Sequence, residues 1–96
     1  MQIELTINDT LVTGDLYDHP VARELFELLP LELVFNDFNQ VEKVAPLGSS
    51  LTLRGVPRAD APGPGEIGYY APSQGLVLYY DSPGRWPGLV VMVAES

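Results

Sequence analysis

The stretch of sequence that decides the fold is residues 62–80, which read Pro-Gly-Pro-Gly-Glu-Ile-Gly-Tyr-Tyr-Ala-Pro-Ser-Gln-Gly-Leu-Val-Leu-Tyr-Tyr. Gly63, Gly65 and Gly68 in this stretch match the G-x-G-x-x-G pattern of a dinucleotide-binding loop. Such a loop needs a strand before it, a helix after it and free backbone N–H groups aimed at phosphate. Here Pro64 has no N–H, Glu66 adds a negative charge, and tyrosines typical of a strand follow. The match is therefore a coincidence of spacing.

The same stretch predicts a β-hairpin over residues 66–80 with its turn at residues 71–75. Pro72 suits the second position of a turn, and Gly75 suits a positive φ. Later in the chain, residues 89–94 form an uninterrupted apolar run. A run of this length is typical of a strand that is buried on both sides or that closes a barrel.

The N-terminal segment predicts a second hairpin. Its apolar residues alternate with polar ones, as in a strand with one buried face: Ile3, Leu5 and Ile7. Asn8-Asp9 supplies the turn, and residues 10–17 form the returning strand.

A helix is predicted over residues 20–29, where apolar residues recur at helical spacing and form one buried stripe: Val21, Ala22, Leu25, Phe26 and Leu29. Asp18 or His19 is placed to cap it, because Pro20 fits the first helical turn, and Pro30 ends it. Two strands follow at residues 31–35 and 41–47, with polar turn residues between them.

A long surface loop then covers residues 48–65, with only residues 51–53 extended. Loops of this kind carry function in some proteins and are plain connections in others.

The composition indicates one domain, residues 1–96, with a formal net charge of −8. A field of that sign repels nucleic acids and anionic lipid headgroups, so we expect neither as a partner. Cysteine is absent, which excludes disulfides and thiolate chemistry and fits a reducing compartment. Residues 1–5 lack the features of a signal peptide, and no segment reaches transmembrane length. These features predict a cytoplasmic protein.

No catalytic signature stands out in the sequence. The single histidine, His19, lies at the predicted helix start, where capping or exposure is expected rather than general-base catalysis. The carboxylates are scattered and predict no metal site, and nothing indicates a cofactor. The best candidates for a small-molecule or peptide groove are aromatic and arginine side chains in turn-rich segments: Arg54, Tyr69, Tyr79, Trp86 and Arg85. For the tyrosines, the alternative is that they line the wall of a barrel.

Several segments together match the pattern of a known family. They are the opening hairpin, residues 3–16; the helix ending in Leu28-Leu29-Pro30; Phe35-Asn36-Asp37-Phe38 leading into Glu42-Lys43-Val44-Ala45; residues 64–72; and the closing Pro87-Gly88-Leu89. In this order they resemble the small microbial cyclophilin-like family, compact relatives of cyclophilin. The resemblance implies a closed, mainly antiparallel β-barrel of about eight strands with one capping helix near residues 20–29.

The resemblance also raises the question of prolyl isomerisation. Cyclophilins twist the X-Pro amide with an arginine in the strand after the first helix, beside an apolar pocket. The corresponding residues 33–45 contain no arginine, and their only cation, Lys43, lacks the planar guanidinium fork. Trp86 resembles the tryptophan that borders the cyclophilin pocket.

We therefore expect a binding domain without robust isomerase activity, which holds a small molecule or extended peptide beside the 66–80 hairpin, the 48–65 loop and Trp86. The first alternative is a weak prolyl isomerase that uses Arg54. The second is a structural or homo-oligomerising module.

Overall fold

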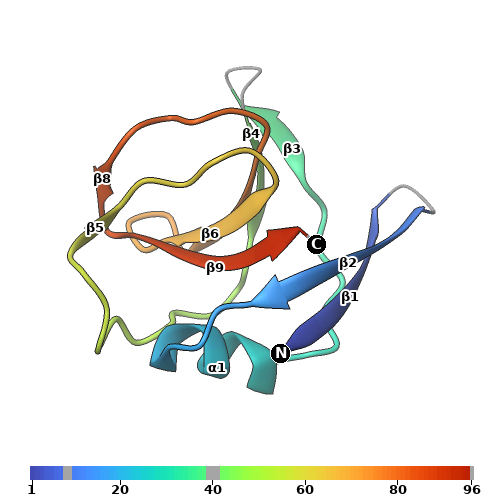
Figure 1. Ribbon diagram of the computed structural model, residues 1–96, viewed down its shortest axis with the longest axis horizontal. Helices are drawn as coiled ribbons and strands as arrows, with labels where there is room; N and C mark the ends of the chain where they lie inside the picture. The colour runs from blue at the N-terminus through green and yellow to red at the C-terminus, as the bar shows by residue number, and fades with distance from the viewer. Residues whose placement is uncertain (8–9, 39–41, 96) are drawn as a thin grey trace.

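The computed structural model describes residues 1–7, 10–38 and 42–95. Within these residues the fold is mainly β with one helix, as predicted (Figure 1). The elements in chain order are β1 (Gln2–Ile7), β2 (Thr10–Leu16), α1 (Pro20–Glu27), β3 (Asn36–Phe38), β4 (Glu42–Pro46), β5 (Ala59–Asp60), β6 (Glu66–Tyr70), β7 (Gly75–Tyr79), β8 (Trp86–Pro87) and β9 (Leu89–Glu95). The helix is too short and too polar to cross a membrane, and no other helix is present in the described part of the chain.

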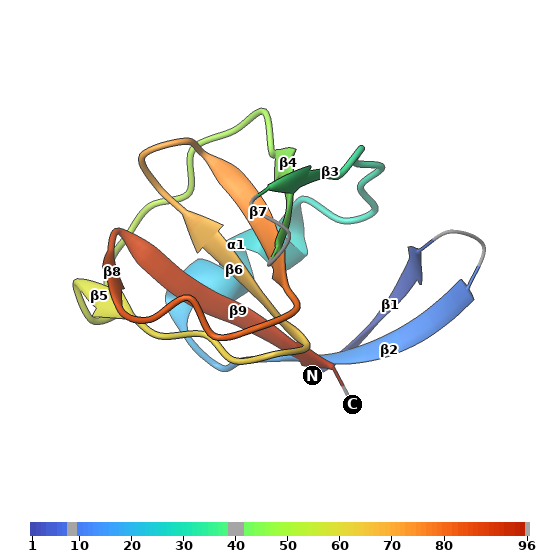
Figure 2. The same ribbon diagram turned by 90° about the horizontal axis from the view of Figure 1, so that it is seen from above.

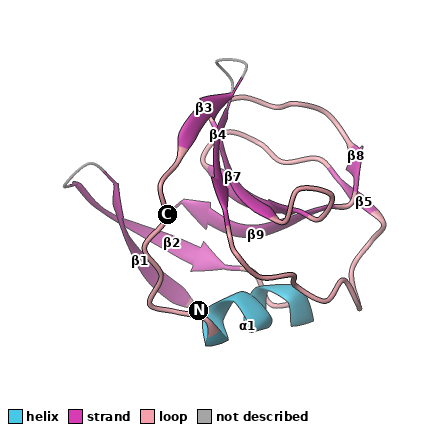
Figure 3. Cartoon of the chain, turned by 180° about the vertical axis from the view of Figure 1, so that it is seen from behind, coloured by secondary structure: helices cyan, strands magenta, loops and turns pink. Residues whose placement is uncertain are grey.

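Seven strands form one antiparallel sheet in the order β1-β2-β9-β6-β7-β4-β3, and β5 pairs with β8 in a separate two-stranded ribbon. The sheet curls strongly on itself, with α1 lying across one end of the curl (Figures 1 and 3). The predicted hairpins of the N-terminal segment and of residues 66–80 are both confirmed, as β1–β2 and β6–β7. The turn predicted at residues 8–9 lies outside the described residues.

The barrel is open, in contrast to the closed barrel of about eight strands that we expected. β1 and β3 are the two ends of the main sheet, and no backbone pairing joins them in the described ranges. Figure 2 shows the β1–β2 hairpin projecting away from β3 and β4.

The predicted strand at residues 31–35 does not form, so this segment adds no strand between β1 and β3. This segment joins no ladder, and the strand that follows it is β3, where we expected a polar turn. Leu33 and Phe35 still pack against the core, whereas Val34 is 78% exposed. The alternation of residues 31–35 thus reflects partial burial of Leu33 and Phe35 without strand pairing, while Leu31 is exposed.

Helix α1 begins where the sequence predicted and ends earlier, at Glu27. The cap is His19: its Nδ1 accepts a hydrogen bond from the Ala22 N–H at 3.0 Å, and its Nε2 lies 2.8 Å from the Val91 carbonyl oxygen. Both bonds are satisfied when Nε2 carries the proton, so His19 links the helix start to β9. The helix buries Val21, Ala22 and Leu25 against the sheet, while Phe26, which we expected on the buried stripe, is 41% exposed.

In the 66–80 hairpin, the Gln74 N–H donates to the Ala71 carbonyl oxygen at 3.1 Å, which places Pro72 at the second turn position, as predicted. The positive φ lies at Gln74 (53°), so the prediction for Gly75 was wrong. Gly75 instead permits close packing, because a Cβ there would lie 3.3 Å from the Ala45 carbonyl oxygen.

The glycine-rich entry to β6 supplies its own hydrogen-bond acceptor. Glu66 Oε1 accepts the Gly63 N–H at 2.6 Å, so a carboxylate occupies the position that a phosphate would need. Gly68 is a close-packing point, since a Cβ there would lie 3.0 Å from Leu89 Cδ1 and 3.2 Å from Tyr79 Cε2. The reading of this stretch as a hairpin entry is confirmed.

The core has two parts on opposite faces of the curled sheet. The larger cluster fills the concave side beneath α1 and includes Leu25, Tyr69 and Met92. The smaller cluster lies on the other face around Val77, Tyr79 and Leu89. β9 contributes to both, which confirms that residues 89–94 form a strand buried on both sides.

The 48–65 loop differs from the prediction in one respect. Residues 51–53 form no strand, and the short strand of this segment is β5, which pairs with Trp86–Pro87. The loop is held to the core because the Leu51 N–H donates to the Tyr69 hydroxyl at 3.1 Å and the Thr52 N–H donates to Glu24 at 3.0 Å.

Candidate ligand-binding cavity

A cavity of about 440 Å³ lies on the concave side of the sheet, at the open end of the half-barrel. It is bounded by β1, by the end of α1, by residues 31–35 and by the central strands. Its lining residues are Ile3, Glu4, Leu5, Thr6, Leu25, Leu29, Leu31, Leu33, Val34, Phe35, Lys43, Ile67, Leu76, Leu78 and Val93. The volume lies in the range of small-molecule sites, and most of the lining is aliphatic.

The floor of the cavity is one row of side chains across four strands. Lys43 is paired with Leu78, Leu78 with Ile67, and Ile67 with Val93. Directly opposed residues in antiparallel strands share one face, so all four side chains belong to the concave face. The row brings one cation onto an otherwise apolar floor.

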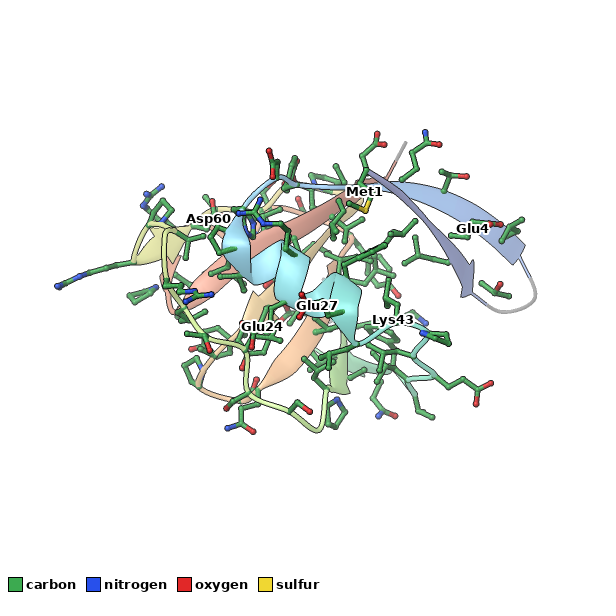
Figure 4. The ribbon with its side chains drawn as sticks, turned by 90° about the horizontal axis from the view of Figure 1, so that it is seen from below. Met1, Glu4, Glu24, Glu27, Lys43 and Asp60 are labelled. Atoms are coloured by element: carbon green, nitrogen blue, oxygen red, sulfur yellow. The ribbon has the colours of Figure 1, made fainter. Side chains whose placement is uncertain are left out.

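The polar groups of the cavity are few. Lys43 is half-buried on the floor, while Glu4 and Thr6 belong to β1 and are exposed. In Figure 4, Lys43 and Glu4 lie toward the β1–β2 side of the molecule, and Asp60 lies toward the opposite side. An apolar wall with a few polar groups at its edge suits a ligand that has an apolar body and hydrogen-bonding atoms.

Two of the predicted site residues are core residues. Tyr69 is 1% exposed, and its hydroxyl accepts the Leu51 N–H inside the larger cluster. Tyr79 is 4% exposed and belongs to the smaller cluster on the other face of the sheet. These two tyrosines therefore do not share a pocket. Their buried positions in the sheet agree with the alternative that they line the barrel wall.

The other three predicted residues are at the surface. Trp86 is 50% exposed in β8, with its indole N–H donating to the Pro83 carbonyl oxygen at 3.1 Å. Arg85 precedes it and is exposed, as is Arg54 in the 48–65 loop. None of the five residues lines the cavity. β8 and the β1–β2 hairpin lie at opposite ends of the molecule in Figures 1 and 2. The binding role of these residues stays a prediction.

The cavity itself was missed at the level of sequence, because apolar side chains that face a cavity have the same pattern as core residues. One signal was present. Lys43 shares its face of β4 with the buried Ala45, and both lie opposite interior leucines of β7. A lysine among core positions of a strand indicates a place where the interior reaches solvent.

Among the described residues, three titratable groups that do not line the cavity have a shifted pKa. The Tyr17 hydroxyl donates to Glu66 Oε2 at 2.5 Å, and this bond, with burial and the charge of Glu66, raises the pKa of Tyr17 to about 12. Burial is the main cause that raises the pKa of Tyr79, followed by the charge of Glu42, its partner across the strands. Burial also raises the pKa of Glu42. Among the described residues, no three histidine or carboxylate side chains lie close enough together to hold a metal ion.

These features define a mainly β domain whose curled antiparallel sheet, capped by one helix, holds an apolar cavity at its open end. A model of the cyclophilin-like family matches residues 5–92 of the chain. The chain therefore belongs to the cyclophilin-like family, and the resemblance drawn from its segments is confirmed. Searches of curated proteins and of solved structures gave no match.

Proposed function

We propose that this domain binds a small apolar molecule or an extended peptide in the cavity at the open end of the half-barrel, without robust prolyl isomerase activity. The observation that carries the proposal is the cavity of about 440 Å³, with aliphatic walls and three polar residues at its floor and edge. The cavity opens to solvent, so its aliphatic walls leave apolar surface in contact with water, which is unfavourable. A ligand with an apolar body would remove that surface from water, which favours binding.

The lack of isomerase activity is proposed from the strand that would hold the catalytic arginine. Residues 33–45 contain no arginine, and their cation, Lys43, is a point charge on the concave face rather than a planar fork. Nor does the structure bring Arg54, Tyr69 and Tyr79 into one pocket. We expect no acceleration of cis/trans exchange in a proline peptide, and catalysed exchange that disappears in Arg54→Ala would contradict this.

The binding proposal is tested by calorimetric titration with N-phenylnaphthylamine, a neutral apolar probe. Leu33 lines the cavity from a segment that joins no ladder, so Leu33→Trp fills space there without breaking a strand. We expect it to weaken probe binding by about tenfold or more, equivalent to about 1.4 kcal/mol. The matched control is Leu53→Trp, which places the same side chain at an exposed leucine of the 48–65 loop.

The same titration separates the cavity from the site first expected beside Trp86. Trp86→Ala leaves the affinity unchanged if the probe occupies the cavity, because Trp86 is not among its lining residues. If Trp86→Ala abolishes binding of the probe and Leu33→Trp does not weaken it, the binding site is beside β8 and not in the cavity. Absence of binding in the unmodified protein, together with a stable dimer in sedimentation, would support the oligomerising alternative.

A further inference from the structure

The outer edge of β1 has backbone groups available for a further strand. The Leu16 N–H donates to the Met1 carbonyl oxygen at 2.7 Å, so Met1 and Leu16 form a hydrogen-bonded pair of the β1–β2 ladder. Such pairs alternate with non-bonded ones along antiparallel strands, so Ile3 and Leu5 also bond to β2. The backbone N–H and C=O groups of Glu4 and Thr6 therefore point away from β2. In the described ranges no strand pairs with that edge.

This free edge faces the cavity. Four consecutive residues of β1, from Ile3 to Thr6, line it. A strand that presented only one of its faces would contribute every second residue, so a consecutive run shows that the backbone edge itself borders the space. Residues 33–35 border it from the other side, and among them Val34 is 78% exposed. The cavity is thus a slot between a strand edge and an extended apolar segment.

The charges around the slot select what can enter it. Glu4 on β1 is exposed, as is Glu32 next to the lining residue Leu33, whereas the cation Lys43 is half-buried on the cavity floor. The whole chain carries a net charge of −8. A second copy pairing its own β1 here would bring Glu4 near its counterpart and set two acidic molecules against each other, which is unfavourable. A strand with basic side chains opposite Glu4 would instead be attracted.

We propose that the slot accepts an extended peptide segment in which apolar and basic residues alternate, and that this segment adds to the free edge of β1 and extends the curled sheet. Its backbone would bond to Glu4 and Thr6, and its apolar side chains would enter the cavity beside Leu5 and above Lys43. Its basic side chains would lie on the other face of the strand, beside Glu4, because successive side chains of a strand point to opposite faces. Main-chain bonds give affinity in this mode, and alternate side chains give specificity. The inference rests on the proposed function, whose cavity it assigns to a peptide.

The test is hydrogen exchange measured by NMR with a blocked hexapeptide of alternating lysine and valine. The amides of Glu4 and Thr6 point outward and should exchange about tenfold more slowly with saturating peptide, while those of Ile3 and Leu5, already bonded to β2, should change little. A hexapeptide of alternating glutamate and valine is the charge control and should not protect them. Glu4→Gln should weaken binding of the lysine peptide, whereas Asp81→Asn, which removes an exposed charge outside the slot, should not.

The outcomes separate this inference from the proposed function. If N-phenylnaphthylamine binds and Leu33→Trp blocks it, but the peptide leaves Glu4 and Thr6 unprotected, the cavity binds small molecules and strand addition is wrong. If the lysine and glutamate peptides protect these amides equally, charge selection is wrong. If neither probe nor peptide binds, the proposed function fails and the inference fails with it.

Discussion

At the scale of single residues, the hydrogen bond between Tyr17 and Glu66 makes the stability of the fold depend on pH. The hydroxyl must keep its proton to donate to the carboxylate, and the contact raises the pKa of Tyr17 from an ordinary 10.0 to about 12. Its contribution to stability is therefore complete below pH 10 and is lost as the pH rises toward 12. Tyr17→Phe should make the free energy of unfolding fall less steeply across this interval in urea titrations. The pKa of Tyr79 is also raised, but this residue is present in both the unmodified protein and Tyr17→Phe. Its contribution to the slope therefore cancels when the two are compared. Equal slopes in both proteins would contradict the assignment.

A second residue-scale prediction concerns His19. Its ring caps α1 through the Ala22 N–H and reaches the Val91 carbonyl, so His19→Ala should lower the free energy of unfolding by about 1–2 kcal/mol. Asp18→Ala is the control, because the Asp18 side chain is 93% exposed and its ion pair with Arg23 contributes little. Chemical denaturation of both variants measures the difference. A larger loss in Asp18→Ala would show that the helix start depends on the ion pair.

At this scale, features that depend on adjacent residues could be predicted from the sequence. Pro20 limited the cap to two residues, and the cap is His19, whose ring also reaches the Val91 carbonyl of β9. The positive φ was assigned to Gly75 and lies at Gln74, since the position of the turn depends on the register of β6 with β7. That register is a property of the pair of strands and cannot be read from either one.

At the scale of elements, Gly68 shows how closely β6 is packed. An alanine there would place its Cβ against Leu89 and Tyr79, which are 1% and 4% exposed and have little room to move. Overpacking outweighs the entropic gain of alanine over glycine, so Gly68→Ala should destabilise the protein by about 1 kcal/mol. Gly63→Ala is the matched control, because its nearest neighbour would be 3.6 Å away. The unfolding midpoints of the two variants measure the difference. Equal stability would show that the side chains of the smaller cluster can move to accommodate the added Cβ.

At the scale of elements, the two hairpins were predictable because each pairs two strands that follow one another in the sequence. Both hairpins, β1–β2 and β6–β7, follow from alternation and turn residues. Residues 31–35 have the same alternation, but a strand also needs an edge to pair with, and this segment meets none. β5 and β8 are separated by the whole β6–β7 hairpin, so the short ribbon that includes Trp86 had no local signal.

At the scale of the whole molecule, the family and the mainly β fold were predictable, and the open end of the barrel was not. Closure depends on whether β1 and β3 meet, and these ends are brought near each other only by the curl of the entire sheet. The candidate residues chosen from sequence were conspicuous aromatic and arginine side chains. The cavity is lined instead by aliphatic residues, with Lys43 as its one unusual floor residue. Cavity-facing and core-facing leucines cannot be distinguished without the fold.

The measurement that tests the central claim most directly is a methyl NMR spectrum of the protein with and without N-phenylnaphthylamine. The account predicts that the largest shifts occur at methyl groups lining the cavity, among them Leu5, Leu78 and Val93. Methyl groups outside it, such as Val77 and Leu89 in the smaller cluster, should shift little. Shifts confined to the smaller cluster, or saturable binding that leaves the cavity methyls unchanged, would contradict the claim that the open end of the half-barrel is the binding site.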